Sequence, residues 1–481
     1  MLPLFPHGGT SLLAGIAPQT KNAASKLAED KAAARRGGPH SKAAPAWQRG
    51  RRRRSSVMTS RERVSLALQH KEADRVPLDL GASAVTGMQV DTVYGLRQAL
   101  GLDRPGTPIK VVEPYQMLGE IGPDLREALG VDVVGLGKPA NMFGFRNEGW
   151  KSWTTFAGTP VLVPEGFNTE PEPNGDILMY PEGDKSVPAS GRLPKGGFYF
   201  DSIVRQPPID DGSLNVEDNL EEFGPISDED LQYLQREAER LYAETDEAIL
   251  ANFGGTAFGD IALVPAPWLK HPRGIRDVEE WYVSTATRRD YVYKIFARQC
   301  EIALQNLERI HQVVSNKIAA VFVTGTDFGS QHGPFISPKA YHDLYKPFHL
   351  QVNHWIHEHT LWKSFIHSCG SVRALIPDFI DAGFDILNPV QCSAVAMDPC
   401  ELKKEFGARI TFWGGGVDTQ HTLPFGTADE VRKEVCERLK TFGPGGGFVF
   451  NTTHNVQARV PIENVLAMYE TVRECGRYPL H

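Results

Sequence analysis

The sequence contains few cysteines and no long apolar run, and both shortages narrow what the protein can be. Its 481 residues include six cysteines, at positions 300, 369, 392, 400, 436 and 475, whose spacing shows no paired framework. Sparse, unpaired cysteines are typical of a reducing compartment, so we expect a cytoplasmic protein. No stretch is apolar over the roughly 20 residues that a membrane helix needs, and we expect no membrane partner.

Basic residues are concentrated at the N-terminus and scarce elsewhere. Residues 1–57 contain 11 Lys and Arg against 2 Asp and Glu, whereas residues 58–481 contain 40 against 57. The main part of the chain is therefore acidic, which argues against nucleic acid as its partner.

The basic leader, residues 1–57, is rich in Ala, Gly, Pro and Arg, a composition that predicts disorder. It has three interpretations: a basic patch for nucleic acid or a membrane, a transit peptide, or a start codon assigned too early. We favour the last, with Met58 as the true start. Thr59 and Glu62 there form a capping box at the beginning of a helix predicted over residues 59–71.

Residues 58–481 are predicted to form one barrel domain with an insertion. Helices are expected over residues 88–101, 228–249 and 289–315, and buried strands over 75–81 and 131–136. Residues 140–225 are rich in Gly, Pro and aromatic residues and lack a helical period, which predicts an antiparallel β insertion. Its clearest signal is the hairpin turn Asn174-Gly175, between the apolar segments 161–163 and 177–179.

The C-terminal part alternates strands and helices five times. Strands are predicted at 318–324, 361–366, 384–390, 409–413 and 448–451, and helices are predicted to begin at Pro338, Ser371, near Pro399, at Thr427 and at Pro461. This alternation is typical of a parallel sheet, and with the earlier strands it predicts a (β/α)8 TIM-type barrel. A doubly wound open sheet is the alternative, but no Gly-rich dinucleotide fingerprint follows a first strand.

Active residues of such barrels lie at the carboxyl ends of the strands. His367 and Cys369 are two residues apart at one strand end, so on extended backbone they point to the same side. An imidazole and a thiolate suit Zn²⁺, and His454 at a later strand end could be the third ligand of an open, catalytic site. The alternative is a packed cysteine beside a hydrogen-bonded histidine.

Other polar residues at strand ends are candidates for the substrate pocket. Asp327 could orient a substrate, transfer a proton or act as a distant ligand, and Asn388 and Gln391 could hydrogen-bond a polar substrate; capping is the alternative for all three. The run Gly414 to Gly416 could let the backbone approach a ligand. A further group of histidines is expected on a solvated helix face, at positions 342, 349, 354, 357 and 359.

Together these motifs resemble the uroporphyrinogen decarboxylase superfamily, in particular its cobalamin-linked methyltransferase branch. The resemblance covers roughly residues 59–475. Its carriers are Arg61-Glu-Arg63 to Asp74-Arg-Val-Pro77, His367-Ser-Cys369-Gly370, Asp385 to Gln391, Phe412 to Gln420, Phe448 to Phe450, His454 to Gln457, and Pro461-Ile-Glu-Asn464.

The resemblance implies a zinc-dependent methyltransferase or demethylase. That branch holds zinc by His-x-Cys and a later Cys, which correspond here to His367, Cys369 and, as a departure, His454. The methyl group would pass between a corrinoid and a small methylated, methoxylated or thiol substrate. No D-x-H-x-x-G motif occurs, so the corrinoid would be carried by a partner protein.

Two other functions remain possible from the sequence. The superfamily's decarboxylases hold a porphyrinogen with several arginines of an N-terminal loop, but residues 76–96 contain no Lys or Arg, which argues against that reaction. A non-catalytic barrel that binds a corrinoid protein or a small ligand is the third interpretation.

Overall fold

The computed structural model describes residues 58–253, 258–260 and 262–480. The interpretations of the leader concern residues 1–57 and lie outside this range. Residues from Met58 onward form one compact unit.

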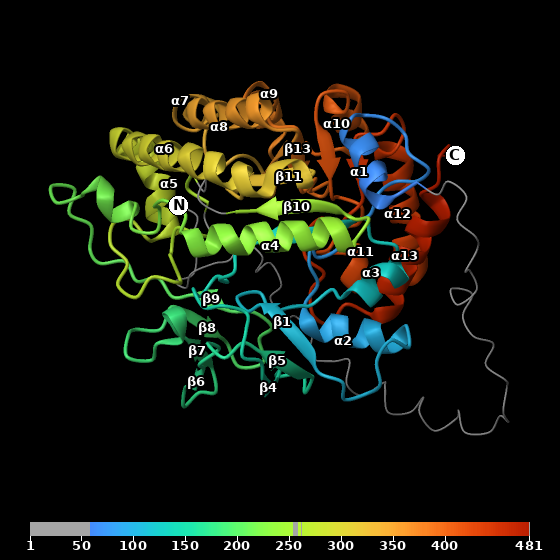
Figure 1. The fold of residues 1–481 in the computed structure, drawn as a ribbon, viewed down its shortest axis with the longest axis horizontal. Coiled ribbons are helices and arrows are strands. Elements are labelled where there is room, and N and C mark those ends of the chain that lie inside the picture. The colour runs from blue at the N-terminus through green and yellow to red at the C-terminus, as the bar shows by residue number, and fades with distance from the viewer. Residues whose placement is uncertain (1–57, 254–257, 261, 481) are drawn as a thin grey trace. The chain divides into compact units, whose positions relative to one another are not determined.

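The core of this unit is a parallel sheet of seven strands in the order β15-β14-β13-β12-β11-β10-β3 (Figure 1). Each neighbouring pair in the sheet is parallel, as the alternation of strands and helices predicts. The strands are β3 (Val133–Gly137), β10 (Ala248–Asn252), β11 (Ala320–Thr324), β12 (Lys363–His367), β13 (Ile386–Asn388), β14 (Thr411–Trp413) and β15 (Phe448–Val449).

The segment predicted as a first strand, residues 75–81, closes the sheet into a barrel. Leu78 pairs in parallel with Phe450 beyond β15, and the amide of Asp79 donates to the Phe450 carbonyl at 2.9 Å. On its other side, the Leu78 carbonyl accepts the amide of Asp132, which precedes β3, at 2.7 Å. The seven strands and this segment confirm the α/β barrel.

Helices surround the barrel, and α4, α6, α8 and α12 can be followed around its strands in Figure 1. They are α1 (Ser60–Leu68), α2 (Val90–Ala99), α3 (Pro123–Leu129), α4 (Asp228–Glu244), α5 (Val278–Thr287), α6 (Arg289–Val314), α7 (Pro338–Leu344), α8 (Lys346–His359), α9 (Ile376–Asp381), α10 (Pro399–Phe406), α11 (Thr422–Phe425), α12 (Ala428–Phe442) and α13 (Ile462–Cys475). No helix of the described residues is long and apolar enough to cross a bilayer.

Helix α1 closes the amino end of the barrel. The predicted capping box is present, with Thr59 and Glu62 each bonding the other's backbone amide. Val64, Ala67 and Leu68 pack against inward-facing strand residues such as Phe365. Apolar side chains thus fill the barrel interior at this end, and active sites of such barrels lie at the opposite, carboxyl ends of the strands.

The region after β3 contains β structure, but its pairing differs from the prediction. The strands β4 (Lys151–Thr154) and β5 (Pro160–Val163) form a sheet with β1 (Ile109–Glu113) and β2 (Leu118–Gly119), in which β5 pairs with β1 in parallel. A second sheet contains β6 (Glu170–Pro171), β7 (Ile177–Met179), β8 (Gly191–Leu193) and β9 (Asp201–Ser202). The turn at Asn174-Gly175 therefore joins β7 to β6, not to residues 161–163.

Three other predictions about the fold are wrong. The helix predicted over residues 228–249 ends at Glu244, and its last residues belong to β10. His349 is fully buried, whereas its four companion histidines on α7 and α8 are exposed. Cys436 of α12 and Cys475 of α13 form a disulfide, although their spacing shows no pairing pattern.

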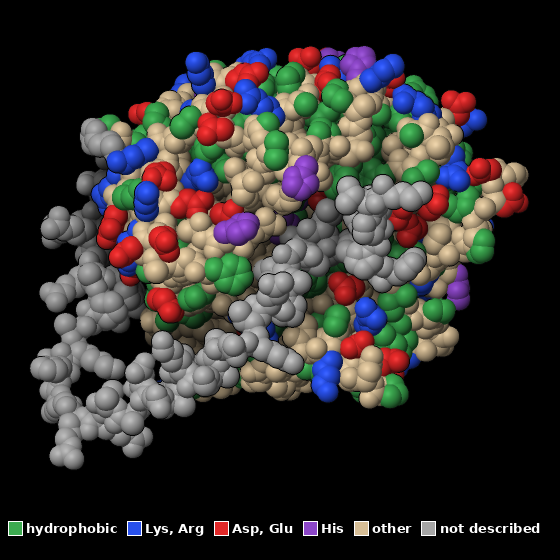
Figure 2. Space-filling model, turned by 180° about the vertical axis from the view of Figure 1, so that it is seen from behind, with side chains coloured by type: hydrophobic (Ala, Val, Ile, Leu, Met, Phe, Trp, Pro, Cys, Tyr) green, Lys and Arg blue, Asp and Glu red, His purple; other side chains and the backbone are tan. Residues whose placement is uncertain are grey.

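The surface of the described residues mixes charges of both signs. Figure 2 shows Lys and Arg side chains interspersed with Asp and Glu over the face opposite to that of Figure 1.

Candidate metal centre

A polar layer lies above the apolar filling of the barrel, and the register of the strands produces it. Phe365 pairs with Ile386, and both point into the apolar interior. Two residues later His367 pairs with Asn388, so both point inward one level closer to the carboxyl ends. Phe322 of β11, which is half-buried, stacks near the His367 ring at 6.3 Å between centroids.

The structure brings His367, Cys369 and His454 together. One candidate ligand atom from each lies within 4.8 Å of the other two, the spacing of groups around a single metal ion. The Cys369 Sγ is 3.5 Å from His367 Nε2, and the two imidazole centroids are 5.6 Å apart. Within the described residues, no other group of three or more His, Cys, Asp or Glu side chains meets this test.

Asn388 orients His367. The Nδ1 atom of His367 lies 2.6 Å from Asn388 Oδ1, while Asn388 Nδ2 donates to the Trp413 carbonyl at 2.8 Å. The bond to Trp413 identifies the amide nitrogen, so Oδ1 must accept and His367 must donate from Nδ1. The lone pair of the neutral ring is therefore on Nε2, which faces Cys369, as in metal sites whose histidines are fixed by an outer hydrogen bond.

Cys369 is held through its backbone. Its amide donates to Asp327 Oδ1 at 2.6 Å, and the next amide, of Gly370, donates to Gln391 Oε1 at 2.8 Å. Gly370 has a φ of +84°, and a Cβ there would lie 2.3 Å from the Gly329 carbonyl oxygen. Only glycine fits this position, which explains why it follows Cys369 directly.

His454 is less well prepared to bind a metal. Its Nδ1 accepts the amide of Asn455 at 2.8 Å, so the proton of the neutral ring is on Nε2 in this arrangement. The loop itself is firmly held, because Asn455 Oδ1 accepts the Gly87 amide and its Nδ2 donates to Gln116 Oε1 at 2.7 Å. His454 must give up the Asn455 contact or move its proton before Nε2 can become a ligand.

Burial controls the charges of this cluster. It lowers the pKa of His454 to about 3, helped by the neighbouring His367, and it also lowers the pKa of His367. Burial, with the Asp327 charge, raises the pKa of the Cys369 thiol well above its ordinary value. Without a cation the site thus holds two neutral imidazoles and a protonated thiol, and a bound cation would favour the thiolate.

The three residues predicted to shape the substrate pocket all contact residues 367–370, the segment that carries His367 and Cys369. Asp327 and Gln391 accept its backbone amides, and Asn388 has both ends of its amide engaged within the protein. Asp327 Oδ1 is 3.8 Å from His367 Nε2, but Asp327 is not in the group of three whose ligand atoms lie within 4.8 Å of one another, and its role as a distant ligand stays a prediction. Contact of any of these residues with a substrate stays a prediction.

Several groups at this end of the barrel were not predicted from the sequence. Asp79 is buried in the closing segment and accepts the Trp413 indole N–H at 2.9 Å. Tyr282 of α5 donates its hydroxyl to the Asp327 carbonyl, and Asp260 lies beside the end of β11. Asp79 stood in a segment already predicted as a buried strand, and an acid there was a signal that could have been used.

The triple glycine has a packing role in the structure. Gly414 and Gly415 have positive φ values, and a Cβ on Gly415 would lie 2.4 Å from the Val390 carbonyl oxygen. A Cβ on Gly416 would enter the Phe450 ring. Close packing within the barrel is thus enough to require these glycines.

Comparisons with known proteins agree with the resemblance carried by the motifs. Residues 286–475 match the family model described as uroporphyrinogen decarboxylase (URO-D). This stretch contains all three candidate ligands. The resemblance to the superfamily is therefore confirmed over this part of the chain.

Curated relatives match a shorter stretch. Uroporphyrinogen decarboxylases are 30% identical over 94 residues in Psychromonas ingrahamii, 32% over 95 in Vibrio vulnificus and 34% over 87 in Legionella pneumophila strain Corby. These matches cover 17 to 19% of this chain and 24 to 26% of each relative, so the chain spans about a quarter of their length. A solved methyltransferase from Methanosarcina mazei is 14% identical, with a TM-score of 0.48 over 87% of this chain and 99% of that one.

Proposed function

We propose that this protein, whose residues 286–475 match the uroporphyrinogen decarboxylase family model, is a zinc-dependent methyltransferase or demethylase that exchanges a methyl group with a corrinoid protein. The observation that carries the proposal is the convergence of His367, Cys369 and His454 within 4.8 Å. The small partner in the reaction would be a thiol or a methylated or methoxylated compound.

The residues present fit zinc. One thiol and two imidazoles are ligands that zinc prefers, and three protein ligands leave a position for a substrate, as in catalytic sites. Burial keeps both imidazoles neutral. His367 offers the Nε2 lone pair that faces Cys369, and His454 would become a ligand once it gives up the Asn455 amide or moves its proton. Bound zinc would supply positive charge that activates a heteroatom of the substrate.

The protein's own residues would orient and shield the reacting group. Asn388 fixes the direction of His367 Nε2, and Asp327 and Gln391 fix the loop that presents Cys369. His367 is 4% exposed and His454 is 9% exposed, so access for a substrate is from the side of the half-buried Cys369 and Phe322. Phe322 offers an apolar surface to the methyl-bearing part of a substrate.

The lack of free arginines near the closing segment, residues 75–81, argues against porphyrinogen decarboxylation. Residues 76–96 contain no Lys or Arg. Arg75, which precedes them, forms ion pairs with Asp132 at 2.6 Å, and Arg97, which follows them, binds Asp103 and Asp124 at 2.6 Å each. Neither guanidinium is therefore left to hold the carboxylates of such a substrate.

The experiment is a measurement of zinc in the full-length protein and in two cysteine variants. We expect about one zinc per chain in the parent, none in Cys369→Ser, and the parent value in Cys400→Ser. Cys400 is a matched control because it is exposed on α10, away from the cluster. A folded parent without zinc would contradict the proposal.

Methyl transfer is then tested with free methylcobalamin and small thiols, and the reaction is monitored by the change in corrinoid absorbance. Turnover should be present in the parent and in Cys400→Ser and lost in Cys369→Ser. Zinc in the parent without turnover on thiols, or on methoxylated donors in the reverse direction, would favour the non-catalytic alternative.

A further inference from the structure

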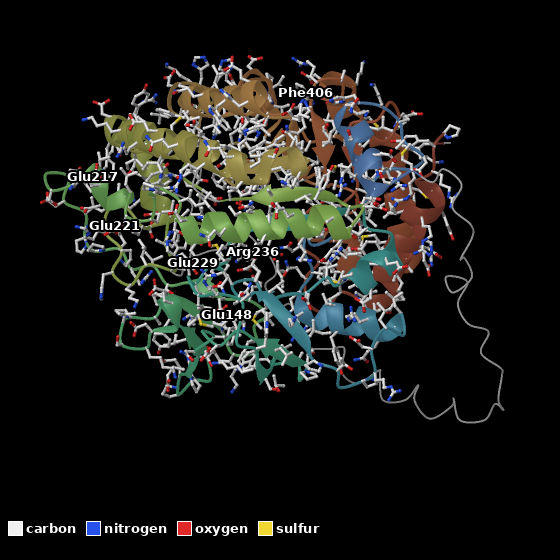
Figure 3. All side chains as sticks on the ribbon, viewed as in Figure 1. Glu148, Glu217, Glu221, Glu229, Arg236 and Phe406 are labelled. Atoms are coloured by element: carbon white, nitrogen blue, oxygen red, sulfur yellow. A yellow bond between two sulfur atoms is a disulfide. The ribbon has the colours of Figure 1, made fainter. Side chains whose placement is uncertain are left out.

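Strand β3 ends in a glycine that faces the interior of the barrel. Successive residues of a strand point to opposite faces. Leu136 belongs to the apolar cluster that packs against α4, the helix that carries Glu229 and Arg236 in Figure 3, whereas Val133 belongs to the cluster inside the barrel. Gly137 is on the same face as Val133, so it points into the barrel at the carboxyl end, where the candidate metal centre lies.

The fold does not require glycine at this position. Gly137 has no positive φ, and a Cβ built on it would meet no atom within 4 Å. Gly135, two residues earlier on the same face, shows the opposite, because its Cβ would lie 2.3 Å from the Ala82 carbonyl oxygen. Glycine weakens a strand, and a glycine that neither backbone conformation nor packing demands is typical of a place where a ligand approaches the backbone.

Gly137 is also exposed, although it faces inward. The strand ends on the other side of the mouth are closed, since the last residues of β12, β13, β14 and β15 are all buried. Solvent therefore enters the mouth of the barrel on the side of β3.

The inner wall leads from Gly137 to the candidate metal centre. Gly137 is paired with Asn252 of β10, and the register between β10 and β11 places Phe322 level with Asn252. The half-buried Phe322 ring lies 6.3 Å from the ring of His367, and Cys369 follows at the same strand end. Three steps between neighbouring strands, of about 4.8 Å each, separate β3 from β12, so the arc along this wall is about 14 Å long.

We propose that the open space at Gly137 receives the body of the substrate, and that Gly137 limits the size of the molecules that reach Cys369. The inference rests on the proposed function, in which Cys369 is part of the reacting centre, and it deepens that function. The substrate is a small molecule whose non-reacting part lies against the backbone of β3, within the length of the arc. A side chain at position 137 would occupy the same space.

Thermal unfolding separates a structural role of this glycine from a role in binding. Gly137→Ala should not lower Tm, because the added Cβ meets no atom and alanine restricts the unfolded chain more than glycine does. Gly135→Ala should lower Tm, because its Cβ would overlap the Ala82 carbonyl. If Gly137→Ala is as destabilised as Gly135→Ala, the fold requires the glycine and the proposal is overturned.

Access to Cys369 is tested by alkylation of the full-length protein in the presence of a metal chelator. N-methylmaleimide and N-pyrenylmaleimide attack a thiol by the same chemistry and differ in size. Both are uncharged, so Lys138, which is exposed beside Gly137, does not select between them. Mass spectrometry of the peptide that contains Cys369 gives each rate, and Cys400, exposed on α10, is the reference within each sample.

Gly137→Leu should slow the reaction of Cys369 with the pyrenyl reagent by about tenfold or more, because the space is then filled, and should leave the reaction with N-methylmaleimide unchanged. Gly224→Leu is the matched control. Gly224 also has open space and no positive φ, but it lies before α4, where its carbonyl accepts the Asn306 amide. Both rates should stay parental in this variant.

Equal effects of Gly137→Leu on the two reagents, or no effect on either, would overturn the proposal. So would a parent in which Cys369 reacts with N-methylmaleimide no faster than the buried Cys300. Neither measurement needs zinc or turnover. A zinc-free parent would therefore contradict the proposed function alone, whereas labelling that does not depend on size in a zinc-binding parent would contradict the size limit alone.

Discussion

Replacing Asn388 by leucine tests whether the residues that orient the ligands, and not the ligands alone, determine metal binding. Asn388 is fully buried and accepts from His367 Nδ1 at 2.6 Å while donating to the Trp413 carbonyl at 2.8 Å. Leucine has the same branched shape but no hydrogen-bond acceptor, so His367 loses the bond that keeps its Nε2 lone pair facing Cys369. Loss of such an outer partner typically lowers metal affinity about 10- to 100-fold, or about 1.4 to 2.7 kcal/mol.

The assay is zinc competition against a chromophoric chelator, with thermal unfolding measured alongside. Asn353→Leu is the control: Asn353 is equally buried and donates to the Ala382 carbonyl at 2.8 Å, but it lies on α8, outside the site. Both variants should lose stability, by about 1 to 3 kcal/mol for each orphaned group, and only Asn388→Leu should lose zinc affinity. A folded Asn388→Leu variant with parental affinity would refute the orienting role.

Three further predictions concern protons and the disulfide. Burial and Asp327 raise the pKa of the Cys369 thiol, so zinc binding near pH 7.5 should release about one proton per chain. Calorimetry in buffers of different ionisation enthalpy measures this release. If no proton is released, the thiol is not a ligand. Burial raises the pKa of Asp79 to about 7 from 3.8, so the folded state keeps a proton that the unfolded state loses; stability should fall by up to about 4 kcal/mol as pH rises from about 4 to 7. Asp79→Asn should remove this slope in denaturant titrations at several pH values, and an equal slope would contradict it. Thiol titration of the denatured, unreduced protein should find the four free cysteines, and reduction should add the two thiols of the Cys436–Cys475 pair. Reduction should also lower the free energy of unfolding by about 4 kcal/mol, because the disulfide closes a loop of 39 residues. Six thiols before reduction would exclude the bond.

The C-terminal half of the fold could be read from local signals. The capping box at Thr427 and Glu430 forms at the beginning of α12, and Pro338 stands at the first turn of α7 behind the Ser337 cap. Short apolar runs between such signals are the strands of a parallel sheet, because buried strands need no polar alternation. Where a capping or proline signal marks the beginning of each helix, the sequence is sufficient to predict the order of strands and helices.

The remaining part depends on contacts between distant residues. The predicted helix ran past Glu244 because Ile249 continues the apolar spacing of α4, although residues 248–252 pair with β3 and become strand β10. The pairing of β5 with β1, and of Cys436 with Cys475, joins segments that no local pattern relates. His349 reads as one of a polar series, but its Nδ1 meets the Tyr341 hydroxyl in the core at 2.9 Å.

In the candidate site, too, the local motif predicts some residues, whereas the contacts between distant segments could not be predicted. His367 and Cys369 could be selected because two residues of extended backbone place them on one side. The hydrogen bonds that hold them could not be predicted. Asp327 follows β11, Asn388 ends β13 and Gln391 comes shortly after it, and these residues reach the site only because the parallel register aligns the strand ends.

Each of these three residues binds the metal-site segment by a hydrogen bond that does not depend on a bound ion. The cost of ordering this segment is therefore met during folding, before any ion arrives. Burial meanwhile leaves the thiol protonated and the imidazoles neutral, so these three side chains carry no charge when no ion is bound. In the proposed metal site a divalent cation would displace the thiol proton, and on this ground the rigidity of the surrounding hydrogen bonds and the affinity for metal should change together.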